Sequence, residues 1–157
     1  MEYMIREMRE EEYPLLKDFL YEAVYVPEGA EPPVRSIIES HELQVYIRDF
    51  GYSRHDHALV AVVDGGIAGA VWVRIIDDYG HLDDEIPSLA LAVHYRYRNS
   101  GIGTALLGEM LANLKLKGYP AVSLSVQKAN YAVRMYQKAD FCIVRENDEE
   151  YVMAAQL

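Results

Sequence analysis

The chain has 157 residues, of which 51% are apolar, and its 25 acidic and 15 basic side chains give a net charge of −10. That length and apolar fraction suit one domain over residues 1–157, and the contents of 10 Gly, 6 Pro and 1 Cys exclude collagen-like, disordered and disulfide-framework proteins. The negative charge argues against nucleic acid as a partner, because phosphate contacts need a basic surface.

The sequence also indicates where the protein works. No apolar stretch approaches the length of a membrane span, and the N-terminus lacks the apolar segment of a signal peptide. The single Cys142 lies in an apolar run, which predicts a buried, reduced thiol in place of a disulfide. These features favour a cytoplasmic protein with no membrane partner.

The first third of the chain is predicted to be mainly helical. A β-capable segment covers residues 3–8, and apolar residues between Leu15 and Ala23 recur at helical spacing. Prolines and a glycine in residues 27–33 break the chain before a second, less regular helical region over residues 37–47.

The rest of the chain is predicted to alternate strands and helices. In order, these are a hairpin of strands over 57–63 and 67–74, an acidic loop over 77–85, a strand over 88–93, a long helix over 101–117, a strand over 122–126, a short helix over 130–138, and strands over 141–145 and 151–154. The order β-α-α-β-β-β-α-β-α-β-β predicts an α/β (α+β) fold around a mixed, mostly antiparallel central sheet.

A polar loop between the strand at 88–93 and the long helix has the features of a phosphate site. It contains Gly101 and Gly103, and unpaired backbone N–H groups at the start of a helix attract anions. The alternative is that the glycines only shape the turn. A P-loop is absent because Thr104 and an alanine follow Gly103, and a dinucleotide fingerprint is absent because Leu106 replaces its third glycine.

Two motifs give a more specific interpretation. Arg98-x-x-Gly101-x-Gly103 matches a Gln/Arg-x-x-Gly-x-Gly/Ala loop, and the run over residues 130–141 matches an Asn-x-Ala-x-x-Leu/Phe-Tyr-x-x-x-Gly-Phe block. Through both motifs the chain resembles the GCN5-related N-acetyltransferase (GNAT) family over nearly its whole length. Asn99 and Asp140 stand where relatives often have glycine, and both residue types tolerate a left-handed backbone.

The resemblance implies a GNAT fold in which the fourth and fifth strands are parallel and splayed, with acetyl-CoA as cosubstrate between them. The loop backbone would hold the pyrophosphate, and the end of the fourth strand would pair with the pantetheine arm. Asn130 would bond the pantetheine or cap the last helix. The residues implied for cosubstrate binding are Leu91, Ala92, Val93, Arg98, Asn99, Ser100, Gly101, Ile102, Gly103, Thr104 and Asn130.

The resemblance further implies acetyl transfer to a primary amine by direct attack in a ternary complex. Tyr136 stands where the family places the general acid, although a chain with 13 Tyr also places some in its core. Glu85 is the candidate general base, with Asp84 as a substitute; the alternative is that both belong to a solvated acidic run. His55 and His57 lack a third ligand, so no metal site is predicted.

The charge is unevenly distributed along the chain. Residues 94–138 carry seven basic side chains and one acidic, a net charge of +6, which leaves −16 for the rest. The acidic part, with Tyr21, Tyr25, Tyr46, Tyr52 and Tyr79, suits a cationic acceptor such as a small-molecule amine or a protein amino group. Two alternatives stay open: a catalytically inactive acyl-CoA-binding module, and an acidic protein-interaction partner. Dimers are frequent in the family, so a homodimer is also left open.

Overall fold

The computed structural model describes all residues, 1–157, and contains seven strands. They are β1 (Met4–Glu7), β2 (His57–Val63), β3 (Gly66–Arg74), β4 (Ser88–Val93), β5 (Ala121–Gln127), β6 (Cys142–Glu146) and β7 (Glu150–Gln156). The helices are α1 (Leu16–Ala23), α2 (His41–Gln44), α3 (Ile102–Leu116) and α4 (Ala132–Lys138), with short 3-10 helices η1 (Glu10–Leu15), η2 (Arg35–Glu39) and η3 (Tyr95–Tyr97). The predicted order of elements is confirmed.

All seven strands form one sheet in the order β1-β2-β3-β4-β5-β7-β6. Every neighbouring pair is antiparallel except β4 and β5, which are parallel. This confirms the predicted mixed, mostly antiparallel sheet. None of the helices combines the length and the apolar character that crossing a bilayer would need.

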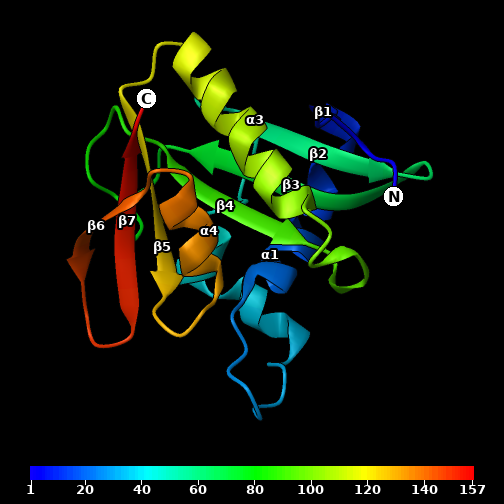
Figure 1. Ribbon diagram of the computed structural model, residues 1–157, viewed down its shortest axis with the longest axis horizontal. Coiled ribbons are helices and arrows are strands. Elements are labelled where there is room, and N and C mark those ends of the chain that lie inside the picture. The colour runs from blue at the N-terminus through cyan, green and yellow to red at the C-terminus, as the bar shows by residue number, and fades with distance from the viewer.

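The parallel pair in the centre of the sheet is splayed. β4 and β5 share a single residue pair, Ser88 with Ser123, next to which the Ser123 N–H donates to the Pro87 carbonyl at 3.0 Å. Beyond that point the two strands separate, as Figure 1 shows. β4 is paired along its length with β3, and β5 with β7, so the facing edges of β4 and β5 lack a strand partner. The predicted splay is confirmed.

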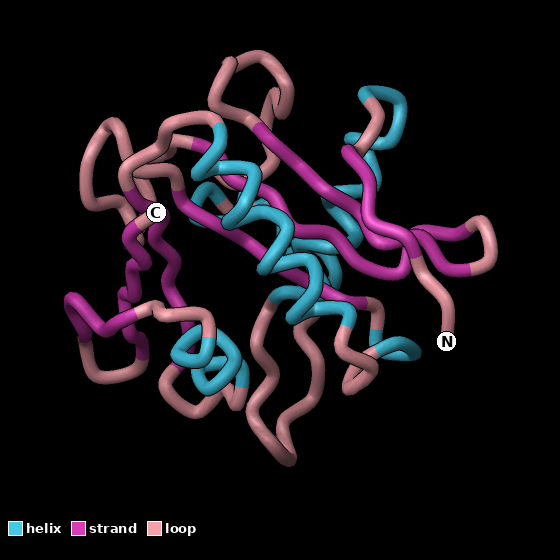
Figure 2. Tube along the Cα trace, turned by 45° about the horizontal axis from the view of Figure 1, so that its top comes forward, coloured by secondary structure: helices cyan, strands magenta, loops and turns pink.

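Side chains alternate along each strand, so each face of the sheet has its own apolar residues. Helices cover both faces. On one face, Leu106, Met110 and Leu114 of α3 pack with alternate strand residues such as Leu124, and α3 lies across the strands in Figures 1 and 2. On the other face, α1 packs with a second apolar cluster around Trp72. α4 belongs to the α3 face, where Tyr136 joins the first cluster.

A buried ion pair anchors the segment between α2 and β2 to the sheet. Two of the three guanidinium nitrogens of Arg74, Nε and Nη2, donate to the Asp56 carboxylate, each at 3.1 Å. Its Nη1 donates to the carbonyls of Val45 and Arg48 at 3.1 and 2.7 Å. The Trp72 indole N–H donates to the Tyr46 carbonyl at 3.0 Å. These bonds fix the position of Tyr46 above the second face of the sheet.

The prediction that Cys142 is buried is wrong. Cys142 is exposed, and so is every residue of β6, because β6 is the outermost strand and neither helix layer covers it. The apolar run around Cys142 contributes only Phe141, 2% exposed, to the core. An apolar run at a sheet edge does not reveal by itself which of its residues reach the core.

Candidate active site

The loop between β4 and α3 offers a row of free hydrogen-bond donors. The six successive backbone N–H groups of residues 99–104 donate to no acceptor in the chain. Asn99 and Gly101 have positive φ angles of 60° and 87°, and this curved backbone leads directly into α3. Free N–H groups beside the positive end of a 15-residue helix fit a pyrophosphate. The loop therefore suits the diphosphate of coenzyme A.

The Arg98 side chain positions this loop. Its Nε donates to the Val93 carbonyl at 3.1 Å, and its Nη2 donates to the carbonyl and the carboxylate of Glu22 at 3.3 and 3.0 Å. The guanidinium thus joins the end of β4 to the end of α1. The Arg98 side chain is thus engaged within the chain, and its hydrogen bonds hold the start of the loop in place.

Gly101 provides the first testable position. We expect Gly101→Ala to raise the Kd for acetyl-CoA about tenfold, because a Cβ at φ 87° strains the loop by roughly 1–2 kcal/mol. Isothermal titration calorimetry would measure this Kd. Gly108→Ala is the matched control, since this glycine lies inside α3 with open space around it and a helical backbone. Equal Kd values for the two variants would contradict the assignment of this loop as the pyrophosphate site.

The end of β4 and the start of α4 border the same splay. Leu91 and Val93 are half-buried on the α3 face, whereas Ala92 is buried on the α1 face. The Asn130 Oδ1 accepts the Ala132 N–H at 2.9 Å, but the N-cap residue of α4 is Tyr131, so Asn130 lies one residue before the cap. The Asn130 amide nitrogen makes no hydrogen bond within the chain, which leaves it available to a ligand.

Tyr136 lies on α4 with its ring in the core. It is 8% exposed, and its ring packs edge-to-face on Phe141 with 5.6 Å between the centroids. Burial raises the pKa of the Tyr136 phenol, so the group is protonated at neutral pH. The hydroxyl has no hydrogen-bond partner in the chain, and because no fully enclosed polar side-chain atom lacks one, this oxygen keeps a small contact with solvent. A protonated, unengaged hydroxyl is suited to proton donation.

The structure leaves Glu85 and Asp84 at the surface. Glu85 is exposed in the turn before β4, where its N–H bonds the Asp83 carboxylate at 2.8 Å. The Asp84 side chain is 96% exposed and pairs with His81 at 3.3 Å. Neither carboxylate contacts Tyr136 or the loop of residues 99–104. The role of Glu85 as a base stays a prediction.

A different carboxylate, which sequence reasoning missed, lies at the point where β4 and β5 meet. Asp78 accepts the Tyr46 hydroxyl at 2.6 Å and the Ser88 hydroxyl at 2.9 Å. Of the other tyrosines named for acceptor binding, Tyr21 and Tyr79 already have arginine side chains over their rings. Asp78 had no distinguishing signal in the sequence, because it is one of five acids in residues 77–85.

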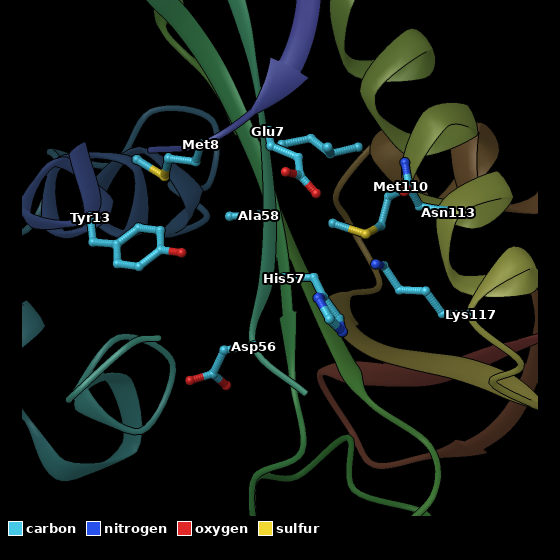
Figure 3. A pocket seen from close by; sticks show the side chains of 10 residues that line it. Glu7, Met8, Tyr13, Asp56, His57, Ala58, Met110, Asn113 and Lys117 are labelled. Carbon is cyan, nitrogen blue, oxygen red and sulfur yellow. The ribbon is translucent and has the colours of Figure 1, made fainter. Parts of the chain in front are cut away.

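The histidine pair lies far from these residues. His55 Nδ1 and His57 Nε2 both contact the Tyr119 hydroxyl, at 2.7 and 3.0 Å, and no group of three or more potential metal ligands occurs in the chain. Figure 3 shows His57 beside Lys117 in a small pocket of about 100 Å³ between the β1–β2 edge and α3. That pocket shares no residue with the loop, the splay or α4.

Comparison with known proteins agrees with this geometry. A sequence model of the acetyltransferase (GNAT) family matches residues 4–141, so the chain belongs to that family. An N-alpha-acetyltransferase of Sulfurisphaera tokodaii is 33% identical over 114 residues, which are 62% of this chain and 68% of the relative.

Solved structures show the same fold. An acetyltransferase of the GNAT family from Streptococcus pneumoniae has a TM-score of 0.70 and 23% identity over 99% of both chains. The PaiA N-acetyltransferase from Thermoplasma acidophilum, solved in complex with coenzyme A, has a TM-score of 0.70 and 21% identity over 100% of both chains. The GNAT fold predicted from the two motifs is confirmed.

Proposed function

We propose that this chain transfers the acetyl group of acetyl-CoA to a primary amine by direct attack in a ternary complex. The single observation that supports it most is the row of free N–H groups in residues 99–104 at the mouth of the splay between β4 and β5. Family membership supports acetyl transfer. The acceptor we propose is an α-amino group of a peptide or protein, since the 33% identical relative is named an N-alpha-acetyltransferase.

Each part of the site has a separate task in this proposal. The N–H groups of residues 99–104 would hold the pyrophosphate, and the free edge of residues 91–93 would pair with the amide groups of the pantetheine arm. Asn130 would donate its free amide N–H to that arm. Acetyl-CoA supplies an activated acetyl thioester when it is bound. Tyr136 would donate its proton to the departing sulfur from the α4 face.

The first test is binding. We expect saturating acetyl-CoA, at about 100 times its Kd, to stabilise the protein by roughly 2.7 kcal/mol and to raise Tm by about 5 to 10 °C. Differential scanning fluorimetry would measure this shift, with Gly101→Ala needing more acetyl-CoA for the same effect. Absence of any shift at saturating acetyl-CoA would contradict the proposal and favour the acidic interaction partner.

The second measurement separates an enzyme from a binding module. Release of CoA thiol is followed with a peptide that has a free α-amino group, with spermidine, and with the same peptide already N-acetylated as the blocked control. We expect release with the free peptide and none above background with the blocked one. Binding without release from any amine would identify an inactive acyl-CoA-binding module.

A further inference from the structure

The sheet has two chemically different faces at the splay. Along β5, the side chains of Val122, Leu124 and Val126 join the apolar cluster under α3 and α4, so alternation directs Ser125 and Gln127 to the opposite face. Tyr136 belongs to the apolar face. The opposite face of β5 is therefore polar, and Tyr46, which packs against the second apolar cluster beside it, bonds Asp78 on this side of the sheet.

Asp78 is held at the vertex of the splay from two directions. Its Oδ2 accepts the hydroxyl of Tyr46, which is fixed by the bond from the Trp72 indole to its carbonyl. Its Oδ1 accepts the hydroxyl of Ser88, the one residue through which β4 pairs with β5. Both carboxylate oxygens therefore have a set direction at the point where the strands begin to part.

The loop that carries Asp78 is itself fastened to β5. The Ser123 hydroxyl donates to the Gly80 carbonyl at 2.7 Å, and a Cβ on Gly80 would lie 3.3 Å from the Leu124 backbone. Arg145 of β6 donates to the Tyr79 carbonyl. The close approach of Gly80 to β5 leaves Asp78 little freedom to move away from the vertex.

Several charged and titratable groups lie around Asp78, among them His81 of its own loop, which pairs with Asp84 at 3.3 Å. Burial, together with the Asp78 and Glu150 charges, raises the pKa of Tyr46, so its hydroxyl stays protonated and donates to Asp78. Glu150 of β7 accepts the Gln127 amide at 3.1 Å, and Arg145 bonds a backbone carbonyl. The surroundings are net acidic, which suits an ammonium ion approaching on this face.

We infer that Asp78, in place of the surface residue Glu85, is the base that takes a proton from the acceptor amine, with Tyr46 and Ser88 as its positioning residues. The inference rests on the proposed function and deepens it. The amine would enter on the polar face with Asp78, and the sulfur would leave toward Tyr136 on the apolar face. Base and acid then act from opposite sides of the sheet, so neither blocks the other.

The proton count closes with these two groups. Asp78 accepts one proton from the ammonium ion and later releases it to solvent. The nitrogen lone pair forms the C–N bond to the acetyl carbon as the C–S bond breaks. Tyr136 protonates the leaving sulfur and is restored by the second proton that the nitrogen loses. The net products are an N-acetyl amine, CoA thiol and one proton in solution.

The test compares Asp78→Asn with Asp77→Asn in the full chain. Asp77 is the exposed neighbour and has no side-chain hydrogen bond or ion pair in the structure, so it is the matched control. With the free α-amino peptide as probe, we expect Asp78→Asn to lower kcat about 100-fold near neutral pH, since a positioned base contributes about 10²–10⁴. The acetyl-CoA thermal shift and the KM for acetyl-CoA should stay as in the control.

The pH profile separates a base from a structural role. Without a base the variant depends on solution deprotonation of the amine, so its rate should rise about tenfold per pH unit below the acceptor's own pKa. Asp78→Glu should recover part of the rate. A loss that is the same at every pH, or a kcat equal to that of Asp77→Asn, would overturn the inference. A pH-dependent loss in Glu85→Gln with none in Asp78→Asn would overturn it in favour of Glu85.

Two further variants keep the inference testable if Asp78→Asn does not fold. Tyr46→Phe and Ser88→Ala retain the carboxylate and remove one hydroxyl donor each, so the pH profile of kcat should move while the thermal shift with acetyl-CoA remains. Unchanged profiles in both would overturn the inference. Failure of the proposed function is distinct, because the unmodified chain would then release no CoA from any amine.

Discussion

Tyr136→Phe is expected to lower kcat at least about 100-fold while the Kd for acetyl-CoA stays within about twofold, because general-acid catalysis contributes about 10²–10⁴. The variant removes only the hydroxyl oxygen, and that oxygen has no hydrogen-bond partner in the chain. The ring, its packing on Phe141 and its place in the core all remain. Steady-state CoA release gives kcat, and isothermal titration gives the Kd.

The control for this variant is Tyr131→Phe. Tyr131 precedes α4 and is 70% exposed, so it tests the loss of a phenol hydroxyl beside the same helix without access to the core. Its kcat should equal that of the unmodified chain. If Tyr136→Phe also keeps full turnover, water protonates the sulfur and the phenol of Tyr136 has only a packing role.

Features written in contiguous residues could be predicted from the sequence. The loop at residues 98–103 and Tyr136 each lie in a short motif, and the structure places the loop between β4 and α3 and Tyr136 on α4 in the first apolar cluster. The positive φ angles of Asn99 and Asp140, 60° and 69°, agree with their replacement of glycine in the family pattern. Local backbone shape depends on local sequence, which is why the expected left-handed conformation of these two residues is confirmed.

Features that depend on contacts between distant segments could not be predicted. Asp78 differs from the other acids of residues 77–85 only through Tyr46 and Ser88, which lie 32 and 10 residues away in sequence. The Arg98 side chain bonds Glu22, 76 residues away. Cys142 is exposed because β6 is the edge strand of the sheet, next to β7. No pattern within the apolar run around Cys142 indicates that its strand lies at the edge.

The position of Tyr46 rests on a buried charge, which leads to the largest expected effect on stability. Arg74 is 8% and Asp56 is 9% exposed, and the guanidinium also satisfies the carbonyls of Val45 and Arg48. Arg74→Ala would leave the Asp56 carboxylate buried without its partner. We expect the free energy of unfolding to fall by about 3–5 kcal/mol, as in other buried pairs that lose one member. Urea denaturation at neutral pH would measure it.

Arg48→Ala is the control for this change, because Arg48 is exposed and contributes only its carbonyl to Arg74. Its free energy of unfolding should change by less than about 0.5 kcal/mol. In Arg74→Ala the segment of residues 45–56 also loses its anchor, so Tyr46 no longer holds Asp78 in place and kcat should fall even below the unfolding transition. A loss of less than about 1 kcal/mol would mean that water reaches Asp56 and that the pair is not what anchors Tyr46.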